Sequence, residues 1–241
     1  MFSGIGRVRE RRLWERGVTD WDALQWSLRS KGAGRLEKEI CDAEDRYRAG
    51  DASYFYDALA PAERWRMLEA FSDCFAFIDV ELDGWRRYSR PTMVGILRGG
   101  RYRCLVRGVN LNREELSKAL EGAGVAVTFN GRRHDMHYIS TMLGHPAPWL
   151  RTIDLRHIAR QAGFPGGLKE VERATGVERL RHVELGAAGQ SVRLWHLWSR
   201  KGSRGARRLL EEYNREDTCN MLPIALRLGS VLKERIAGNV S

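Results

Sequence analysis

Three acidic residues alternate with apolar residues in the run FIDVELDG at positions 77–84, namely Asp79, Glu81 and Asp83. Successive side chains of a strand point to opposite faces, so this spacing predicts three carboxylates on one face. The apolar residues around them favour an interior strand, where a carboxylate is costly unless a cation or hydrogen-bond donors meet it. The alternative is an edge strand with a solvated acidic face.

Acids also follow two later elements. In VTFNGRRHD, positions 127–135, Asn130 and Gly131 predict a turn that leaves a strand, and Asp135 stands at or near the start of a helix. In YNRED, positions 213–217, Tyr213 and Asp217 are four residues apart and therefore share one face of a predicted helix. Each feature also has a plain structural interpretation. Asp135 could be a helix cap, and Tyr213 and Asp217 could be an ordinary structural pair on one helix face.

As a set, these acids indicate metal chemistry. Asp79 and Glu81 would meet Asp135 where the strands end, and Asp217 would join them from a late helix. Carboxylate oxygens are the ligands that Mg²⁺ and Mn²⁺ prefer, and bridging carboxylates hold two such ions about 3.5 to 4 Å apart for in-line displacement at phosphorus. We therefore expect two divalent ions, with Asp79 as the bridging ligand and Tyr213 orienting the attacking water.

The elements that must position these residues change in character along the chain. Up to about residue 70 the pattern is helical, with helices predicted at 7–16, 20–30, 35–48 and 61–71. Strands are predicted at 74–80, 92–97, 102–106 and 125–129 and around Ile153, and helices at 113–121, 136–143, 168–175, 191–198 and 203–228. This order predicts an α/β fold, a mixed central sheet flanked by helices, in residues 72–241, preceded by a small all-α module in residues 1–70.

Composition narrows the possible partners. The 241 residues are 43% hydrophobic, enough for a packed core, and the formal net charge is +10. Such a charge favours nucleic acid, although nonspecific attraction to polyanions produces the same composition. No apolar run approaches the roughly 18 residues that span a bilayer, and the charged start does not resemble a signal peptide, so we expect a cytoplasmic protein. The four cysteines lack metal-ligand spacing, which argues against structural zinc or a disulfide framework.

Five segments in order resemble a known family. They are FIDVELDG (77–84), VTFNGRRHD (127–135), TIDLRHIAR (152–160), GGLKEVERATGVER (166–179) and EEYNREDTCNML (211–222). Residues from about 72 to 230 thereby resemble the YprB-type RNase H-like domain. More broadly, they resemble the DEDD-type 3′-5′ exonucleases of the branch with a tyrosine four residues before the last aspartate.

The resemblance implies an RNase H-like fold and assigns roles by position. The implied metal ligands and catalytic tyrosine are Asp79, Glu81, Asp135, Tyr213 and Asp217. Asp154 in IDL matches a position that we interpret as structural. Relatives carry Thr-Thr where this chain has Leu82-Asp83, and Phe where it has His134, so contacts with the terminal nucleotide are expected to differ.

Other residues are candidates for contact with nucleic acid. The stretch FSGIGRVRERR resembles a helix-hairpin-helix-like element, in which Gly4 and Gly6 let backbone N–H groups approach a phosphate; an ordinary glycine turn beside solvated arginines is the alternative. Trp85 could stack on a terminal base, and the alternative is that it is buried against a neighbouring loop. Asn130 and Lys169 could approach the nucleic acid, and the alternative for Lys169 is an ordinary solvated lysine. Four tryptophans at helical spacing are interpreted as packing residues, namely Trp14, Trp21, Trp26 and Trp65.

The sequence therefore predicts a metal-dependent exonuclease that hydrolyses phosphodiester bonds at the 3′ end of DNA or RNA. A structure-selective endonuclease would use the same acids. A protein that binds nucleic acid on a nuclease fold without cutting it is the third possibility.

Overall fold

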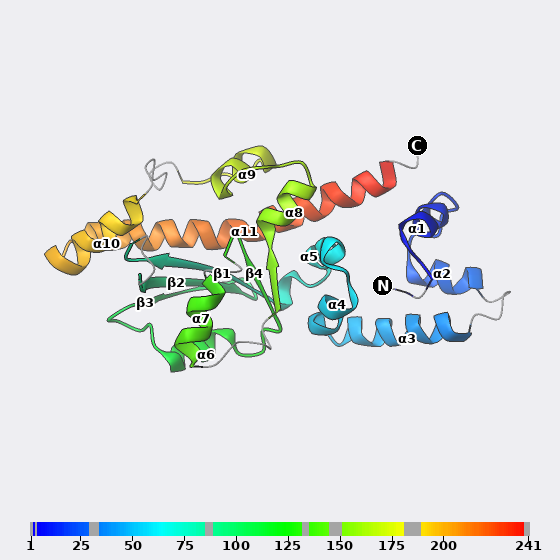
Figure 1. Ribbon diagram of the computed structural model, residues 1–241, viewed down its shortest axis with the longest axis horizontal. Coiled ribbons are helices and arrows are strands. Elements are labelled where there is room, and N and C mark those ends of the chain that lie inside the picture. Colours follow the sequence, from blue (N-terminus) through cyan, green and yellow to red (C-terminus); the bar gives the residue numbers. More distant parts are fainter. Residues whose placement is uncertain are drawn as a thin grey trace.

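The computed structural model of the chain describes residues 2, 4–28, 34–84, 89–131, 135–144, 151–180 and 189–238. Their strands form one sheet in the order β3-β2-β1-β4-β5 (Figure 1). The strands are β1 Phe75–Leu82, β2 Pro91–Arg98, β3 Arg101–Val106, β4 Val125–Thr128 and β5 Arg151–Asp154. β2 lies antiparallel to β1 and β3, whereas β1, β4 and β5 are parallel. The predicted mixed sheet is confirmed, and the edge-strand alternative is wrong because β1 is central.

The antiparallel half of the sheet is a meander in which a glycine turn joins β2 to β3. β2 and β3 are joined by Gly99 and Gly100, whose φ angles are +52° and +71°. Two consecutive positive φ values suit the right-handed twist of a hairpin, and only glycine adopts them without strain. The turn sets the register in which Arg98 pairs with Arg101.

Helices cover both faces of the sheet (Figure 1). α6 Arg113–Leu120 and α7 Asp135–Leu143 pack on one face, where Ala76 and Ile78 of β1 are buried. α8 Leu155–Gln161, α9 Leu168–Thr175 and the long α11 Arg204–Gly238 pack on the other, where Phe75 and Phe77 are buried. Since strand residues alternate, Asp79 and Glu81 belong to the face that α11 covers.

The amino-terminal helices divide between two cores. They are α1 Arg7–Trp14, α2 Trp21–Leu28, α3 Gly34–Arg48, α4 Ala52–Ala58, η1 Pro61–Arg66, α5 Met67–Ala70 and η2 Ser72–Cys74. Leu24, Leu28, Leu36 and Ile40 form a small separate cluster, whereas Phe55 and the residues of η1 and α5 join the main core against α11. Trp65 is buried as expected, but Trp26 is 76% exposed, so the packing interpretation is wrong for that residue.

The last element to introduce is α10 Gln190–Lys201, which packs against the first turns of α11. In Figure 1, α10 and the first turns of α11 extend beyond the strands at the end of the molecule opposite α1. None of the described helices combines the length and the apolar character needed to cross a bilayer. All four cysteines carry free thiols.

Candidate metal centre

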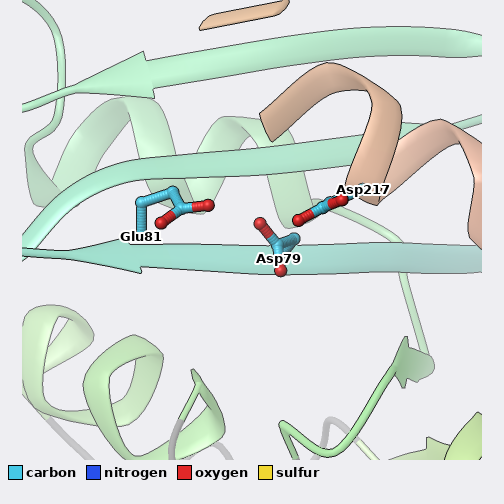
Figure 2. A group of neighbouring side chains, drawn as sticks. All are labelled: Asp79, Glu81 and Asp217. Carbon is cyan, nitrogen blue, oxygen red and sulfur yellow. The ribbon is translucent and has the colours of Figure 1, made fainter. Parts of the chain in front are cut away.

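Three of the predicted acids converge over the middle of the sheet. Asp79 and Glu81 come from β1 and Asp217 from α11, and one carboxylate oxygen of each lies within 4.8 Å of the other two (Figure 2). Residues far apart in the chain thus bring three hard oxygen donors within the span of a metal coordination sphere.

The close approach of α11 depends on a glycine. Gly95 of β2 pairs with Asp79 in the sheet register. A Cβ at this position would lie 2.2 Å from Oγ1 of Thr218 and 2.4 Å from Oδ1 of Asn214, both of which are fully buried on α11. Any side chain here would push the helix away from the sheet, and Asp217 with it.

A buried amide holds Asp79 in place. Nδ2 of Asn214 donates to Oδ2 of Asp79 at 2.8 Å, and Oδ1 of Asn214 accepts from the Tyr102 hydroxyl at 2.8 Å. One oxygen of the Asp79 carboxylate is therefore held by a buried amide. Sequence reasoning missed Asn214, although it lies inside the YNRED motif between the two residues that were singled out.

A buried arginine does the same for Asp217. Arg179 donates through Nη2 to Oδ1 of Asp217, and through Nη2 and Nε to Glu172 at 2.7 and 3.1 Å. The side chains of Arg179 and Glu172 are only 5% and 3% exposed, and Asn220 of α11 also donates to Glu172. Both charged residues lie in the GGLKEVERATGVER segment, so the signal was present but was not assigned to the site.

Glu81 and Asp83 have different partners. The Ser191 hydroxyl at the start of α10 donates to the Glu81 carboxylate. Asp83 accepts two hydrogen bonds from Arg107, both at 2.9 Å, and one from the backbone N–H of Arg90. The expectation that all three carboxylates share one strand face is wrong for Asp83, because the pairing of β1 with β2 shifts between Glu81 and Leu82, the strand ends at Leu82, and Asp83 forms an ion pair with Arg107.

The electrostatics show the cost of gathering these acids. Burial, followed by the charges of Glu81, Asp217 and Asp135, raises the pKa of Asp79 well above its ordinary value. Burial, followed by the charge of Asp217, raises the pKa of Glu81 to about 7. Burial also raises the pKa of Asp217, while Arg179 acts in the opposite direction. A divalent cation would remove this repulsion, so the donor set fits a hard metal ion.

Asp135 lies beside the cluster but not within the group of three. It begins α7, and its carboxylate folds back over Gly131, where a Cβ would lie 1.9 Å from Oδ2 of Asp135. Its charge acts on Asp79 and Glu81, and burial together with Asp154 raises its own pKa to about 7. Its role as a metal ligand stays a prediction.

Tyr213 lies beside Asp217, and its role in orienting water stays a prediction. Its hydroxyl donates to Asp217, and burial, followed by the charges of the three clustered acids, raises its pKa. The cationic groups of Lys169 and Arg179 lie 5.5 and 5.6 Å from the centre of its ring. Lys169 is thus brought from α9 to the edge of the site, which the sequence alone left open.

The other predicted contact residues have different surroundings. Asn130 adopts a φ of +62°, and its Oδ1 accepts from Nη1 of Arg156 at 2.7 Å. Asp154 caps α8 and also accepts from the backbone N–H of Asn130, which gives it a structural role. Gly4 and Gly6 precede α1, at the other end of the molecule from α10 (Figure 1). Trp85 and His134 lie outside the described residues.

Comparisons with known proteins give one family. Searches of curated proteins and of solved structures found no match. A family model described as the RNase H superfamily matches residues 76–228, which include β1 and α11 as far as Leu228 and therefore all of the acids discussed above. The predicted RNase H-like fold is confirmed. The chain belongs to the RNase H superfamily, whose nucleases act on nucleic acid with divalent metal ions.

Proposed function

We propose that this protein is a metal-dependent 3′-5′ exonuclease of the DEDD type with a catalytic tyrosine. The observation that carries the proposal is the convergence of Asp79, Glu81 and Asp217, with the Tyr213 hydroxyl bonded to Asp217. Membership of the RNase H superfamily supports nuclease chemistry, and the tyrosine favours this branch of it. The substrate would be the 3′ end of DNA or RNA, and the products would be mononucleotides.

The acids would hold two ions, Mg²⁺ or Mn²⁺. In that state the ions would supply activation of water and stabilisation of charge on the leaving 3′ oxygen. Their protein ligands would be Asp79, Glu81, Asp135 and Asp217.

The protein's own groups would position the reactants. Asn214 fixes one oxygen of Asp79 and Arg179 fixes one oxygen of Asp217, so the carboxylates need little reorganisation when substrate binds. Tyr213 would orient the attacking water through its hydroxyl, which the bond to Asp217 holds in place. Lys169, near the tyrosine ring, is suited to attract the terminal phosphate.

Hydrolysis of an oligonucleotide labelled at its 5′ end tests the proposal. In Mn²⁺ the full chain should produce a ladder that shortens by one nucleotide from the 3′ end. Asp79→Asn and Asp217→Asn should each reduce hydrolysis to background, because each removes a charged oxygen ligand. Asp83→Asn is the matched control two residues after Glu81, and it should retain activity because Asp83 is paired with Arg107.

Each other outcome has a defined meaning. A single internal cut would replace the exonuclease with a structure-selective endonuclease. Absence of any product would leave a nucleic-acid-binding protein on a nuclease fold. Full activity in both Asp79→Asn and Asp217→Asn, with unchanged melting temperatures, would show that the acidic cluster is not the active site.

A further inference from the structure

A second feature, outside the acidic cluster, is the concentration of positive charge at one end of the molecule. We call residues 190–210, which comprise α10 and the first turns of α11, the basic hairpin. This segment contains six arginine and lysine residues and no aspartate or glutamate. It contributes +6 to a chain whose formal net charge is +10. The basic residues are Arg193, Arg200, Lys201, Arg204, Arg207 and Arg208.

Most of these cations face solvent. Arg207 is partly buried, pairs with Glu211 at 2.8 Å and lies over the ring of Trp198. The other five are exposed, and none of them forms an ion pair with any residue that the structure describes. Five uncompensated charges in two short helical stretches repel one another, which is a cost unless a polyanion binds there.

The tryptophans of the basic hairpin do not share this exposed surface. Trp195 is 6% exposed, and the guanidinium of Arg107 lies 4.7 Å from the centre of its ring. Trp198 is half-buried and packs edge-on against Trp195. Surfaces that bind single-stranded nucleic acid combine positive charge with exposed aromatic rings on which bases stack. The basic hairpin presents exposed positive charge, but its aromatic rings are not exposed for bases to stack on.

The basic hairpin also starts at the metal centre. Ser191, in its first turn, donates a hydrogen bond to the Glu81 carboxylate. From there α10 extends over 12 residues, or about 18 Å, beyond the end of the sheet (Figure 1). A nucleic acid whose 3′ end reached the acids could therefore lie along this surface.

We propose that the basic hairpin binds the phosphate backbone of a double-stranded segment next to the 3′ end. Duplex DNA carries one charge per roughly 1.7 Å of axis, so the length of duplex that spans about 18 Å carries roughly ten phosphates, of which only part face any one surface. Five exposed cations without exposed aromatic rings match a backbone of this kind and give binding that is independent of base sequence. The proposal rests on the exonuclease function and adds its substrate class, a 3′ end adjoining a duplex.

The test compares two sets of charge removals in the full chain. The hairpin variant carries Arg193→Gln, Arg200→Gln, Arg204→Gln and Arg208→Gln. The control variant removes four exposed cations from other elements and carries Lys38→Gln, Arg113→Gln, Arg160→Gln and Arg227→Gln. Both variants are checked for an unchanged melting temperature. Dissociation constants are measured by fluorescence anisotropy in chelator, so that hydrolysis does not interfere, for a blunt DNA duplex, an RNA duplex and a single strand.

The decisive quantity is the salt dependence of duplex binding. Each lost phosphate contact reduces the slope of log Kd against log salt concentration by about 0.9, so the hairpin variant should reduce it by roughly 3 to 4. The control variant should leave the slope unchanged. Equal effects of the two variants, or no effect of the hairpin variant, would overturn the proposal. An equal reduction of the slope for the single strand would overturn the duplex assignment.

The outcome is separate from that of the cleavage test. If the ladder forms but the slope does not change, the exonuclease stands and the basic hairpin is not its duplex-binding surface. If the slope changes but no ladder forms, the duplex surface stands and the exonuclease function fails.

Discussion

Glu81 shows at the residue scale what it costs to gather carboxylates away from water. Its pKa rises from an ordinary 4.5 to about 7, because of burial and the neighbouring Asp217, against the effect of the Ser191 hydrogen bond. In the unfolded chain the group titrates near its ordinary value. Between about pH 4.5 and 7 the native state therefore binds more protons than the unfolded state, and the stability of the metal-free protein falls as the pH rises through this window.

We predict that Mn²⁺ raises the melting temperature of the protein more at about pH 8 than at about pH 5. At the higher pH the acids are ionised and repel one another until a cation binds, whereas at the lower pH Glu81 and Asp135 are protonated. Calorimetry with chelator and with excess Mn²⁺ measures the two shifts. Glu81→Gln should reduce the difference between them, and Asp83→Asn should not. Equal Mn²⁺ shifts at both pH values would contradict this account.

At the scale of elements, the site depends on how closely α11 lies on the sheet. One turn of this helix carries Tyr213, Asn214 and Asp217, and the next residue, Thr218, packs over Gly95 of β2. The strand supplies the other acids in its second half, which pairs with β2 and lies beyond the residues that pair with β4. The geometry of the candidate metal centre is therefore a property of one contact between a helix and a strand.

Gly95→Ala should disturb this contact. The added methyl group would overlap buried side-chain atoms of α11, so we expect a loss of about 1–3 kcal/mol in the free energy of unfolding, together with reduced hydrolysis. Gly229→Ala, in α11, is the matched control. Its Cβ would have only ordinary contacts at 3.8 Å, and alanine favours helix. Denaturant unfolding of both variants measures the difference. Unchanged stability and activity in Gly95→Ala would show that α11 does not need the close approach.

At the scale of the whole molecule, the core crosses the boundary expected from the sequence near residue 70. Phe55, Trp65, Met67, Leu68 and Phe71 are buried together with residues of β1 and α11. By contrast, α1 is tied to η1 mainly through surface ion pairs such as Arg7 with Glu63, which contribute about 0–1 kcal/mol each. The helices from α4 onward therefore belong to the fold that carries the site.

Two truncations test this division. A chain of residues 51–241 should unfold cooperatively and bind Mn²⁺, because it keeps the main core. A chain of residues 72–241 should fail to fold, because it loses five large buried side chains worth about 1.5–3 kcal/mol each, a total comparable to the usual stability of a domain, about 5–15 kcal/mol. Circular dichroism and calorimetry distinguish the cases. A well-folded 72–241 chain would place the boundary where the sequence suggested.

Short-range patterns predicted much of this protein. The alternation in β1 places Asp79 and Glu81 on one face, the four-residue spacing places Tyr213 beside Asp217, and two glycines close the β2–β3 hairpin. These features follow from the periods of strand and helix and from the conformational freedom of glycine, which act within a few residues. The sequence by itself therefore determined the five strands, most of the helices and three acids of the candidate site, but it missed the short helices α4 and α8.

The tertiary structure decided which neighbours those residues have. Asp83 continues the spacing of Asp79 and Glu81, yet it lies just beyond the end of β1 and pairs with Arg107. Trp26 has a helical spacing that suits packing, yet it faces solvent. Asn214 and Arg179 orient the carboxylates only because α11 and the segment after α9 meet over the sheet. Such partners depend on which surfaces pack together, and no local period of the chain encodes that contact.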